Sequence, residues 1–340
     1  MDKGLHEMRV LVVGCGSIGQ RHLKNLRALG VPSLAACDPS EAQLSKVAGD
    51  AGTQGFADLE SALGVFRPQV VFVCTPPVFH IAQARQALQA GAHVFVEKPL
   101  SHTLEGVEAL YAQAVQQRRV VQVGYNLRYH PLLQKAKRLV EKGTIGTPQW
   151  ARVEVGQYLP DWRPSQDYRQ SYTARQELGG GIILDGSHEL DYVLWLLGRP
   201  VEVRCMAGRV SNLKVDVEDC ATVLLRFAGG AQADVHMDMV QPVRCRSGKL
   251  TGDEGVVEWD LIAQQLRWRR SESESWQVEQ APTDFQATFD GTYVEEVRSF
   301  LKRVEDGDTS LENLESARLT LEVAVAAKAA AESGTAVRLT

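Results

Sequence analysis

The feature that most constrains the fold of this chain is a glycine-rich turn at residues 14–19. The turn reads Gly-Cys-Gly-Ser-Ile-Gly, directly after an apolar run and directly before an amphipathic stretch. A GxGxxG turn in this position is typical of dinucleotide-binding folds. Its first glycine makes the tight turn, its second lets the backbone approach a pyrophosphate, and its third lets helix and strand pack closely. A purely structural glycine turn is the alternative. On the first interpretation the helix start binds phosphate through Gly14, Gly16, Ser17, Ile18 and Gly19.

The pattern of apolar residues up to residue 123 predicts a doubly wound α/β domain. Near-continuous apolar runs are typical of parallel strands that helices cover on both faces. Five such runs occur, at residues 8–13, 33–37, 70–74, 93–97 and 120–123. Amphipathic stretches suited to helices lie at 18–29, 41–51, 80–90 and 104–117. This alternation indicates a parallel sheet, so we predict a Rossmann domain over residues 1–123.

The pattern changes after Gly124. Residues alternate between apolar and polar in 150–155 and 233–239, which predicts strands with one exposed face. Helical patterns occur at 130–141, 293–305 and 311–332. We therefore predict that residues 124–340 form an α+β domain with a large open, mostly antiparallel sheet. Such a sheet commonly pairs with a copy of itself, so we expect a homodimer or homotetramer.

Composition excludes several classes of protein. The chain has 340 residues, 44% hydrophobic and 23% charged, as in a soluble globular protein of two domains. A net charge of −5 argues against a nucleic-acid partner, and no apolar run approaches the ~18–20 residues of a membrane span. The N-terminus lacks a signal-peptide layout and the six cysteines include no CxxC, so we expect a cytoplasmic protein without disulfides. The histidines and cysteines show no metal-ligand spacing, so no metal is expected.

The second predicted strand ends at Asp38, 19 residues after Gly19. A carboxylate there accepts hydrogen bonds from ribose hydroxyls and repels a 2′-phosphate, which predicts NAD rather than NADP. The alternative is a strand-end aspartate that caps the next helix, since Ser40 follows. The third strand leads into the edge of the sheet where ligands bind. We expect further cofactor contacts there, from Thr75, Pro76, Pro77 and His80.

Four segments together resemble the glucose–fructose oxidoreductase/inositol dehydrogenase (Gfo/Idh/MocA) family. They occur in the expected order: GCGSIGQRH at 14–22, CTPPVFH at 74–80, VEKPLS at 96–101 and GGGIILDGSHELDYVLWLLG at 179–198. The resemblance implies a Rossmann domain followed by an open-faced sheet domain. It also implies reversible oxidation of a carbinol with NAD(P), usually on a sugar or cyclitol. Two alternatives stay open: glycoside cleavage with tightly held NAD, and an NAD-sensing protein without catalysis.

The resemblance implies that Lys98 is the catalytic or substrate-orienting lysine, and that the bond before Pro99 is often cis. Lys98 follows the fourth predicted strand, and a cation there stabilises the charge that develops on an alkoxide. A surface lysine at a strand end is the alternative. Glu97, its neighbour, is expected to contact the cofactor with it.

His188 stands between two carboxylates, with Asp185 three residues before it and Asp191 three residues after it. On one helix the three side chains would share a face. A histidine with a pKa near ~6.5 can take a hydroxyl proton, and the resemblance implies this role for His188. Many relatives place the aspartate four residues before the histidine, so either Asp185 or Asp191 is left to orient the imidazole. The alternative is a helix-start histidine capped by Asp185.

Residues 158–169 combine aromatic and charged side chains. Aromatic rings stack on sugars and arginines bind carboxylate or phosphate, so Trp162, Arg163 and Arg169 predict an anionic, amino or nucleotide-linked sugar. The alternative is a loop held together by its own Arg–Asp pairs. The resemblance adds Arg128 as a substrate contact. The glycines at 179–181 are expected to let the backbone approach a ligand, with simple loop flexibility as the alternative.

Overall fold

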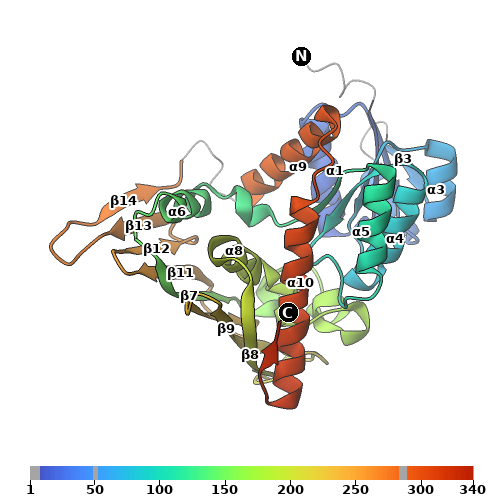
Figure 1. The fold of residues 1–340 in the computed structure, drawn as a ribbon. Helices are drawn as coiled ribbons and strands as arrows, with labels where there is room; N and C mark the ends of the chain where they lie inside the picture. The colour runs from blue at the N-terminus through green and yellow to red at the C-terminus, as the bar shows by residue number, and fades with distance from the viewer. Residues whose placement is uncertain (1–7, 49–52, 283–288, 340) are drawn as a thin grey trace. The chain divides into compact units, whose positions relative to one another are not determined.

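The chain passes three times between two structural units, each drawn in Figure 1. The computed structural model describes residues 8–48, 53–282 and 289–339. The first unit comprises Met1–Tyr125 and Tyr293–Arg318, and the second comprises Asn126–Thr292 and Leu319–Thr340. Residues 124–340 were predicted to form one C-terminal domain. In the structure, Tyr293–Arg318 belongs to the first unit instead.

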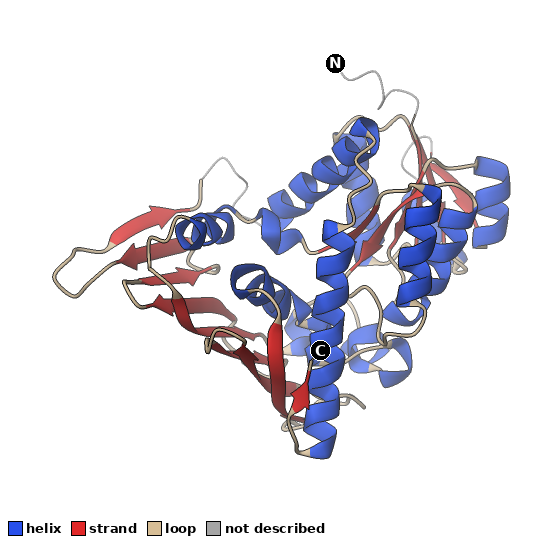
Figure 2. Ribbon diagram, in the orientation of Figure 1, coloured by secondary structure: helices blue, strands red, loops and turns tan. Residues whose placement is uncertain are grey.

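The first unit contains a six-stranded sheet in the order β3-β2-β1-β4-β5-β6. Figure 2 draws strands in red and helices in blue. Every neighbouring pair is parallel, which confirms the predicted doubly wound Rossmann fold. The strands are β1 (Arg9–Val13), β2 (Ser33–Cys37), β3 (Thr53–Phe56), β4 (Val70–Val73), β5 (His93–Glu97) and β6 (Val121–Gly124). The helices between them are α1 (Ser17–Ala28), α2 (Glu41–Ala48), α3 (Leu59–Phe66), α4 (Pro77–Gln89) and α5 (Val107–Gln117). The strand order reverses between β1 and β4, where such folds bind ligands.

The apolar pattern did not predict β3 and α3. β3 is an edge strand whose Gln54 and Gly55 are exposed, so it lacks the apolar run of a central strand. α3 starts at a polar cap, because the Asp58 carboxylate accepts the Ser61 N–H at 2.8 Å. β3 therefore lacks an apolar signal, whereas α3 has one, with Ala62 and Leu63 buried, that the sequence-based prediction missed.

Part of α9 (Phe289–Asp306) packs into the core of the first unit because it carries an apolar stripe. Val297, Phe300 and Leu301 are buried in the same cluster as strand residues of the parallel sheet. The Phe300 ring centroid lies 5.6 Å from that of Phe72 and 5.4 Å from that of Phe95. These aromatic contacts are the physical reason why a segment from the end of the chain belongs to the N-terminal unit.

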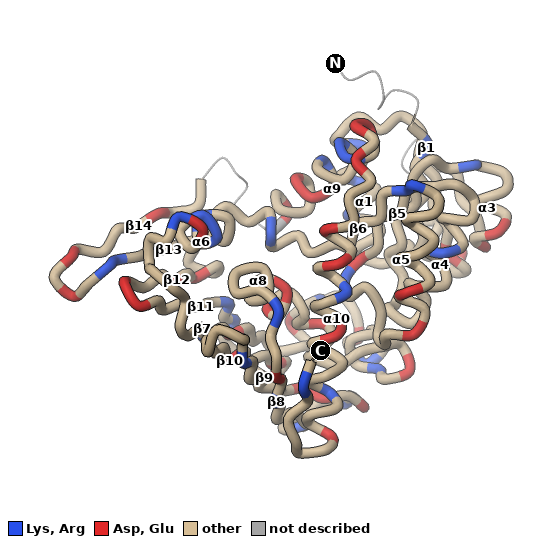
Figure 3. Tube along the Cα trace, viewed as in Figure 1, with Lys and Arg blue, Asp and Glu red and all other residues tan. Residues whose placement is uncertain are grey.

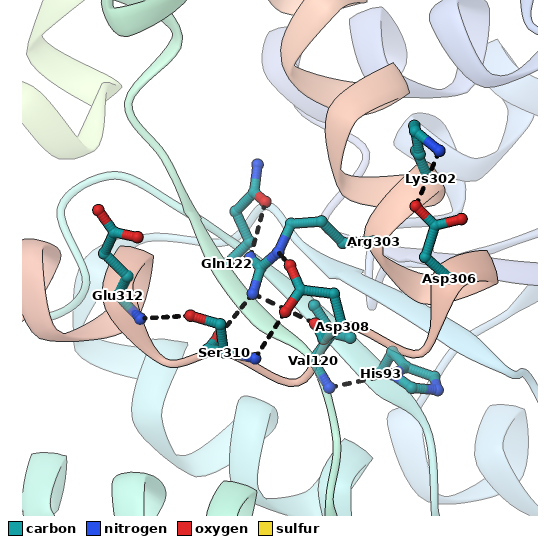
Figure 4. A network of polar contacts seen from close by, with 9 residues as sticks. All are labelled: His93, Val120, Gln122, Lys302, Arg303, Asp306, Asp308, Ser310 and Glu312. Atoms are coloured by element: carbon teal, nitrogen blue, oxygen red, sulfur yellow. Dashed lines mark hydrogen bonds and ion pairs between the residues drawn. The ribbon is translucent and has the colours of Figure 1, made fainter.

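A polar network around Arg303 anchors the turn that follows α9 (Figure 4). The guanidinium donates to the Asp308 carboxylate at 3.1 Å, to the Ser310 carbonyl at 2.5 Å and to Gln122 Oε1 of β6 at 3.2 Å. The Asp308 carboxylate also accepts the Ser310 N–H at 3.0 Å. The turn leads into α10 (Glu312–Ser333), which begins in the first unit and ends in the second.

The second unit is built on a nine-stranded sheet in the order β14-β13-β12-β11-β7-β10-β9-β8-β15. Only β7 and β10 pair in parallel, which confirms the predicted open, mostly antiparallel sheet. The strands are β7 (Pro148–Gly156), β8 (Pro200–Gly208), β9 (Cys220–Phe227), β10 (Gln232–Asp238), β11 (Cys245–Gly252), β12 (Val256–Asp260), β13 (Gln265–Arg269), β14 (Gln277–Gln280) and β15 (Val337–Arg338). The helices are η2 (Asn126–Tyr129), α6 (Pro131–Glu141), η3 (Leu159–Asp161), η4 (Tyr168–Gln170), η5 (Tyr172–Ala174), η6 (Gln176–Leu178), α7 (Ile182–Asp185) and α8 (Ser187–Leu197).

The two faces of this sheet differ in polarity. Alternate residues of β10, Ala233, Val235 and Met237, are buried, while Asp234 and His236 between them are partly exposed. Basic and acidic residues are interspersed along the strands (Figure 3). The described helices include none with the length and apolarity of a membrane span.

Candidate active site

The glycine-rich turn of the first unit leaves room for a phosphate. A Cβ added at Gly14, whose φ is +92°, would lie 2.7 Å from the Cys74 carbonyl oxygen, and one added at Gly19 would overlap the Gly14 carbonyl oxygen. A Cβ added at Gly16 would meet nothing within 4 Å. No side chain caps α1 at this end, so its first N–H groups stay available to an anion. The protein's own packing requires Gly14 and Gly19, whereas Gly16 borders open space, so the turn fits a pyrophosphate.

Asp38 lies beside this turn at the end of β2. Its Oδ2 accepts the Cys15 N–H at 2.8 Å, and its Oδ1 accepts the Ser40 N–H at 2.9 Å. An ionised carboxylate has about four acceptor positions, so two remain for the hydroxyls of a ribose. Asp38 therefore orders the turn and the segment before α2, and its contact with a ribose stays a prediction.

The cysteines near the turn are chemically quiet. All six cysteines of the chain are free thiols, as expected. Burial raises the pKa of Cys15 to about 12 and that of Cys37 to about 11. Since the thiolate is the reactive form, these side chains act as small apolar residues beneath the turn.

Lys98 directly follows β5, and its peptide bond to Pro99 is cis. The preceding Glu97 is buried and has partners within the protein. Its Oε1 lies 2.6 Å from His22 Nε2, and its Oε2 accepts the Lys98 N–H at 3.1 Å. The sequence analysis placed Glu97 among the cofactor contacts, whereas the structure joins its carboxylate to α1 and to the Lys98 backbone.

His80, an expected cofactor contact, has close contacts within the protein. Its ring is buried, with Nδ1 2.8 Å from the Pro99 carbonyl oxygen and Nε2 2.7 Å from the Thr75 carbonyl oxygen. Burial lowers the pKa of His80, and a neutral imidazole donates through only one nitrogen at a time. The neutral ring therefore donates to only one of these two carbonyl oxygens at a time and lies in contact with the loops after β4 and β5. Thr75 in turn donates to Gln83 at 2.6 Å, and Pro76 and Pro77 start α4.

In the second unit the segment around His188 is not one continuous helix. α7 ends at Asp185, and α8 begins at Ser187 after Gly186. Asp185 accepts hydrogen bonds from Tyr172 Oη at 3.0 Å and from Thr173 Oγ1 at 2.5 Å. His188 lies in the first turn of α8 and is 7% exposed. The sequence analysis missed Tyr172 and Thr173, because no motif marks a hydroxyl that reaches a carboxylate 12 or 13 residues away.

Asp191 and Arg128, two residues singled out in the sequence, form an ion pair. The Arg128 guanidinium donates to both Asp191 oxygens at 2.8 Å, and Thr320 donates to the same carboxylate at 3.2 Å. The expected roles of Arg128 as a substrate contact and of Asp191 in orienting His188 stay predictions. The neighbouring Glu189 is fully buried and pairs with Arg246 at 2.7 Å. Glu189 and Asp191 are two residues apart on α8, so they face different sides of the helix and pair with different arginines.

The glycine run before α7 is required by packing. A Cβ added at Gly180 would overlap the Tyr172 carbonyl oxygen. One added at Gly181, whose φ is +106°, would overlap the Glu218 carboxylate. Close approach to protein atoms therefore explains these two glycines, in place of loop flexibility.

The loop at 158–169 shows the internal pairing that was the alternative interpretation. The Arg169 guanidinium binds both oxygens of the exposed Asp167, with a shortest distance of 2.7 Å, and it lowers the pKa of Asp167. Trp162 donates from Nε1 to the Gln157 carbonyl oxygen at 2.9 Å. Within the described part of the chain Arg163 forms no ion pair. Trp162 and Arg163 therefore remain candidates for substrate contact, while Arg169 is engaged within the loop.

Comparison with known proteins identifies the two halves of the chain. Residues 8–125 match a family model described as an oxidoreductase family with an NAD-binding Rossmann fold, and residues 133–258 match the GFO/IDH/MocA C-terminal domain. The scyllo-inositol 2-dehydrogenase (NAD(+)) of Bacillus subtilis (strain 168) is 28% identical over 346 residues, covering 98% of this chain and 97% of that protein. The myo-inositol 2-dehydrogenase of Thermotoga maritima is 27% identical over 350 residues, covering 98% of each chain.

A solved structure extends the match to the whole fold. The crystal structure of GenD2 from gentamicin A biosynthesis, in complex with NAD, is 25% identical with a TM-score of 0.83. The alignment covers 99% of this chain and 97% of that chain. The resemblance noted in the sequence is thereby confirmed. The chain belongs to the Gfo/Idh/MocA family of oxidoreductases, and its first unit is an NAD-binding Rossmann domain.

Proposed function

We propose that the protein catalyses reversible NAD-dependent oxidation of a secondary alcohol on a sugar or cyclitol. The observation that carries this proposal is the edge of the parallel sheet in the first unit. The open position at Gly16 follows β1, and Lys98 follows β5. The carboxyl ends of parallel strands share one edge, so a phosphate site and a cation are available on the same side of the sheet. The inositol dehydrogenase relatives, aligned over nearly the whole chain, support the substrate class.

The chemistry divides between the cofactor and a few side chains. NAD, when bound, supplies the hydride acceptor at C4 of its nicotinamide ring. Lys98 donates a hydrogen bond to the reacting hydroxyl oxygen and stabilises its developing negative charge. His188 takes the hydroxyl proton as general base. Asp185, held by Tyr172 and Thr173, supplies a fixed negative charge in the segment that carries His188.

For the substrate we propose a sugar with an anionic, amino or nucleotide-linked group. Trp162 offers an aromatic face, and Arg163 forms no ion pair within the described residues. An aromatic face and an arginine together suit a sugar ring that carries a carboxylate or phosphate. A neutral polyol as the preferred substrate would contradict this finer assignment and leave the dehydrogenase assignment intact.

The test is a substrate panel with purified protein. Inositols, neutral hexoses, uronic acids, amino sugars and nucleotide sugars are each incubated with NAD or with NADP, and NADH or NADPH formation is recorded. We expect turnover with NAD on a sugar or cyclitol, and its loss in Lys98→Ala and His188→Ala. Failure of every compound to produce reduced cofactor, despite measurable NAD binding, would contradict the proposal.

We also propose that the chain forms a homodimer or homotetramer through the open face of the nine-stranded sheet. Leu224 of β9 is 47% exposed and pairs across the sheet with Asp234 of β10, which is on the solvent-accessible face. Met206 of β8, 83% exposed, pairs with Thr222 and so lies on the same face as Leu224, and neighbouring exposed apolar side chains are a feature of surfaces that pair. Light scattering after size exclusion tests this, and a monomer at micromolar concentration would contradict it.

A further inference from the structure

We propose that His22 is a positioning residue for Lys98, acting through the buried carboxylate of Glu97. This inference rests on the proposed function, because Lys98 is the residue assigned to the reacting hydroxyl. His22 lies on α1, the helix that begins at the phosphate-binding turn, and Glu97 is the last residue of β5. The contact between them joins the start of the cofactor site to the lysine.

His22 lies in a buried environment lined by aromatic rings. Its side chain is fully buried, and its ring centroid lies 5.2 Å from those of both Phe72 and Phe95. Nε2 lies 2.6 Å from Glu97 Oε1, whereas Nδ1 has no hydrogen-bond partner among the described residues. An N–H on Nδ1 would be a buried donor without an acceptor, which is costly. The tautomer with its hydrogen on Nε2 is therefore favoured, and it donates to the carboxylate.

The second carboxylate oxygen of Glu97 contacts the backbone of Lys98. Oε2 accepts the Lys98 N–H at 3.1 Å, so the carboxylate holds the backbone from which the lysine side chain starts. Gly124 at the end of β6 flanks this carboxylate, since a Cβ added there would lie 3.4 Å from Glu97 Cδ. The tighter approach at Gly124 is to the Phe95 ring, at 3.1 Å, so the carboxylate packs beside β6 without a clash.

Tyr293 packs beside the contact between His22 and Glu97. Tyr293 of α9 stacks edge-on to His22, with ring centroids 6.2 Å apart, and the Arg21 guanidinium lies 4.7 Å from the Tyr293 ring centroid. Burial raises the pKa of Tyr293, and the neighbouring Glu97 raises it further, so the phenol keeps its proton at neutral pH. The Glu97 carboxylate enclosed in this way accepts hydrogen bonds from the His22 side chain and the Lys98 backbone.

These contacts hold the Lys98 backbone, and through it the Lys98 ammonium group, in a fixed position. Without the His22 donor, a buried carboxylate loses one of its hydrogen bonds and is free to turn away from the Lys98 N–H. The ammonium group then samples a wider range of positions. Misplacement of a reacting group by about 1 Å can lower a rate about 100-fold.

The experiment compares two polar substitutions of His22. The amide of glutamine reaches approximately where Nε2 lies, so His22→Gln keeps a donor to Glu97, while the shorter His22→Asn does not. We expect kcat close to that of the parent for His22→Gln, and a decrease of about 10- to 100-fold for His22→Asn with little change in KM for NAD. The control is His93→Leu at the opposite end of β5, which removes the acceptor of the Val120 N–H and lies away from Lys98. It should lower the melting temperature and leave kcat unchanged.

A second readout needs no substrate. The rate at which an acylating reagent modifies Lys98, relative to the exposed Lys302, is measured by mass spectrometry on the folded protein. The ratio should match the parent in His22→Gln and increase several-fold in His22→Asn. If the parent turns over no sugar, the proposed function fails, and this ratio still decides the positioning role. Equal kcat and equal labelling in the two His22 variants would overturn the inference, as would losses of kcat that follow the melting temperature in all three variants.

Discussion

Gly16 and Gly19 separate cofactor binding from folding within one turn. Gly16 has a φ of −65°, which alanine also adopts, and its added Cβ would meet no protein atom within 4 Å. Gly16→Ala should therefore fold at least as stably as the parent, since such a substitution gains about 0.4–1 kcal/mol from the unfolded state. A Cβ at Gly19 would overlap the Gly14 carbonyl oxygen, so Gly19→Ala should cost about 1–3 kcal/mol or more of stability.

Cofactor binding should show the opposite order. At an NAD concentration 100 times Kd, binding stabilises the parent by about 2.7 kcal/mol. If the added methyl of Gly16→Ala blocks the pyrophosphate and raises Kd about 100-fold, the same NAD concentration adds only about 0.4 kcal/mol. The assay is denaturant unfolding with and without NAD. A Gly16→Ala protein that keeps the full NAD stabilisation, or a Gly19→Ala protein as stable as the parent without NAD, would refute the reasoning.

Three further substitution or pH effects follow from the contacts. Asp38→Ala removes the charge that opposes a 2′-phosphate, so the ratio of the NADP to the NAD dissociation constant should fall at least tenfold, as titration calorimetry can measure. Arg128→Ala leaves the buried Asp191 unpaired and should cost about 3–5 kcal/mol in urea unfolding, while Arg169→Ala, at an exposed pair, should leave the unfolding midpoint unchanged. Burial lowers the pKa of His93 and His130 to about 4 each, so the unfolded chain binds more protons between pH 6.5 and 4. Stability should therefore fall as the pH drops through this window, less steeply in His93→Gln, and an unchanged slope in that variant would contradict the assignment.

Elements that are determined by a local pattern of residues were predictable from the sequence. The strands at the centre of the parallel sheet are apolar because helices cover both faces, and the turn at 14–19 contains glycines because backbone atoms come close there. The GGG segment was expected to let the backbone approach a ligand, whereas the atoms that come close to Gly180 and Gly181 belong to the protein. Local physics determined each of these features, so the local sequence carries the signal.

The partners of the charged residues were not predictable in the same way. Asp185, His188 and Asp191 look like one cluster in the sequence, but the break at Gly186 and the reach of Arg128 give the two aspartates different partners. The pair formed by His22 and Glu97 joins residues 75 positions apart, through strand order and helix packing. The return of the segment after Thr292 to the first unit likewise depends on which hydrophobic core the apolar stripe of α9 packs into. Tertiary register decides such contacts, and one sequence does not show it.

The central claim is that Lys98 and His188 carry out NAD-dependent oxidation of a sugar-type alcohol. Its most direct test is the kcat of Lys98→Ala and His188→Ala on the best substrate of the panel, with NAD affinity measured in parallel. We expect each variant to lose about 10²–10⁴ in kcat, and His188→Ala to bind NAD like the parent. Near-parent turnover in both variants would contradict the account.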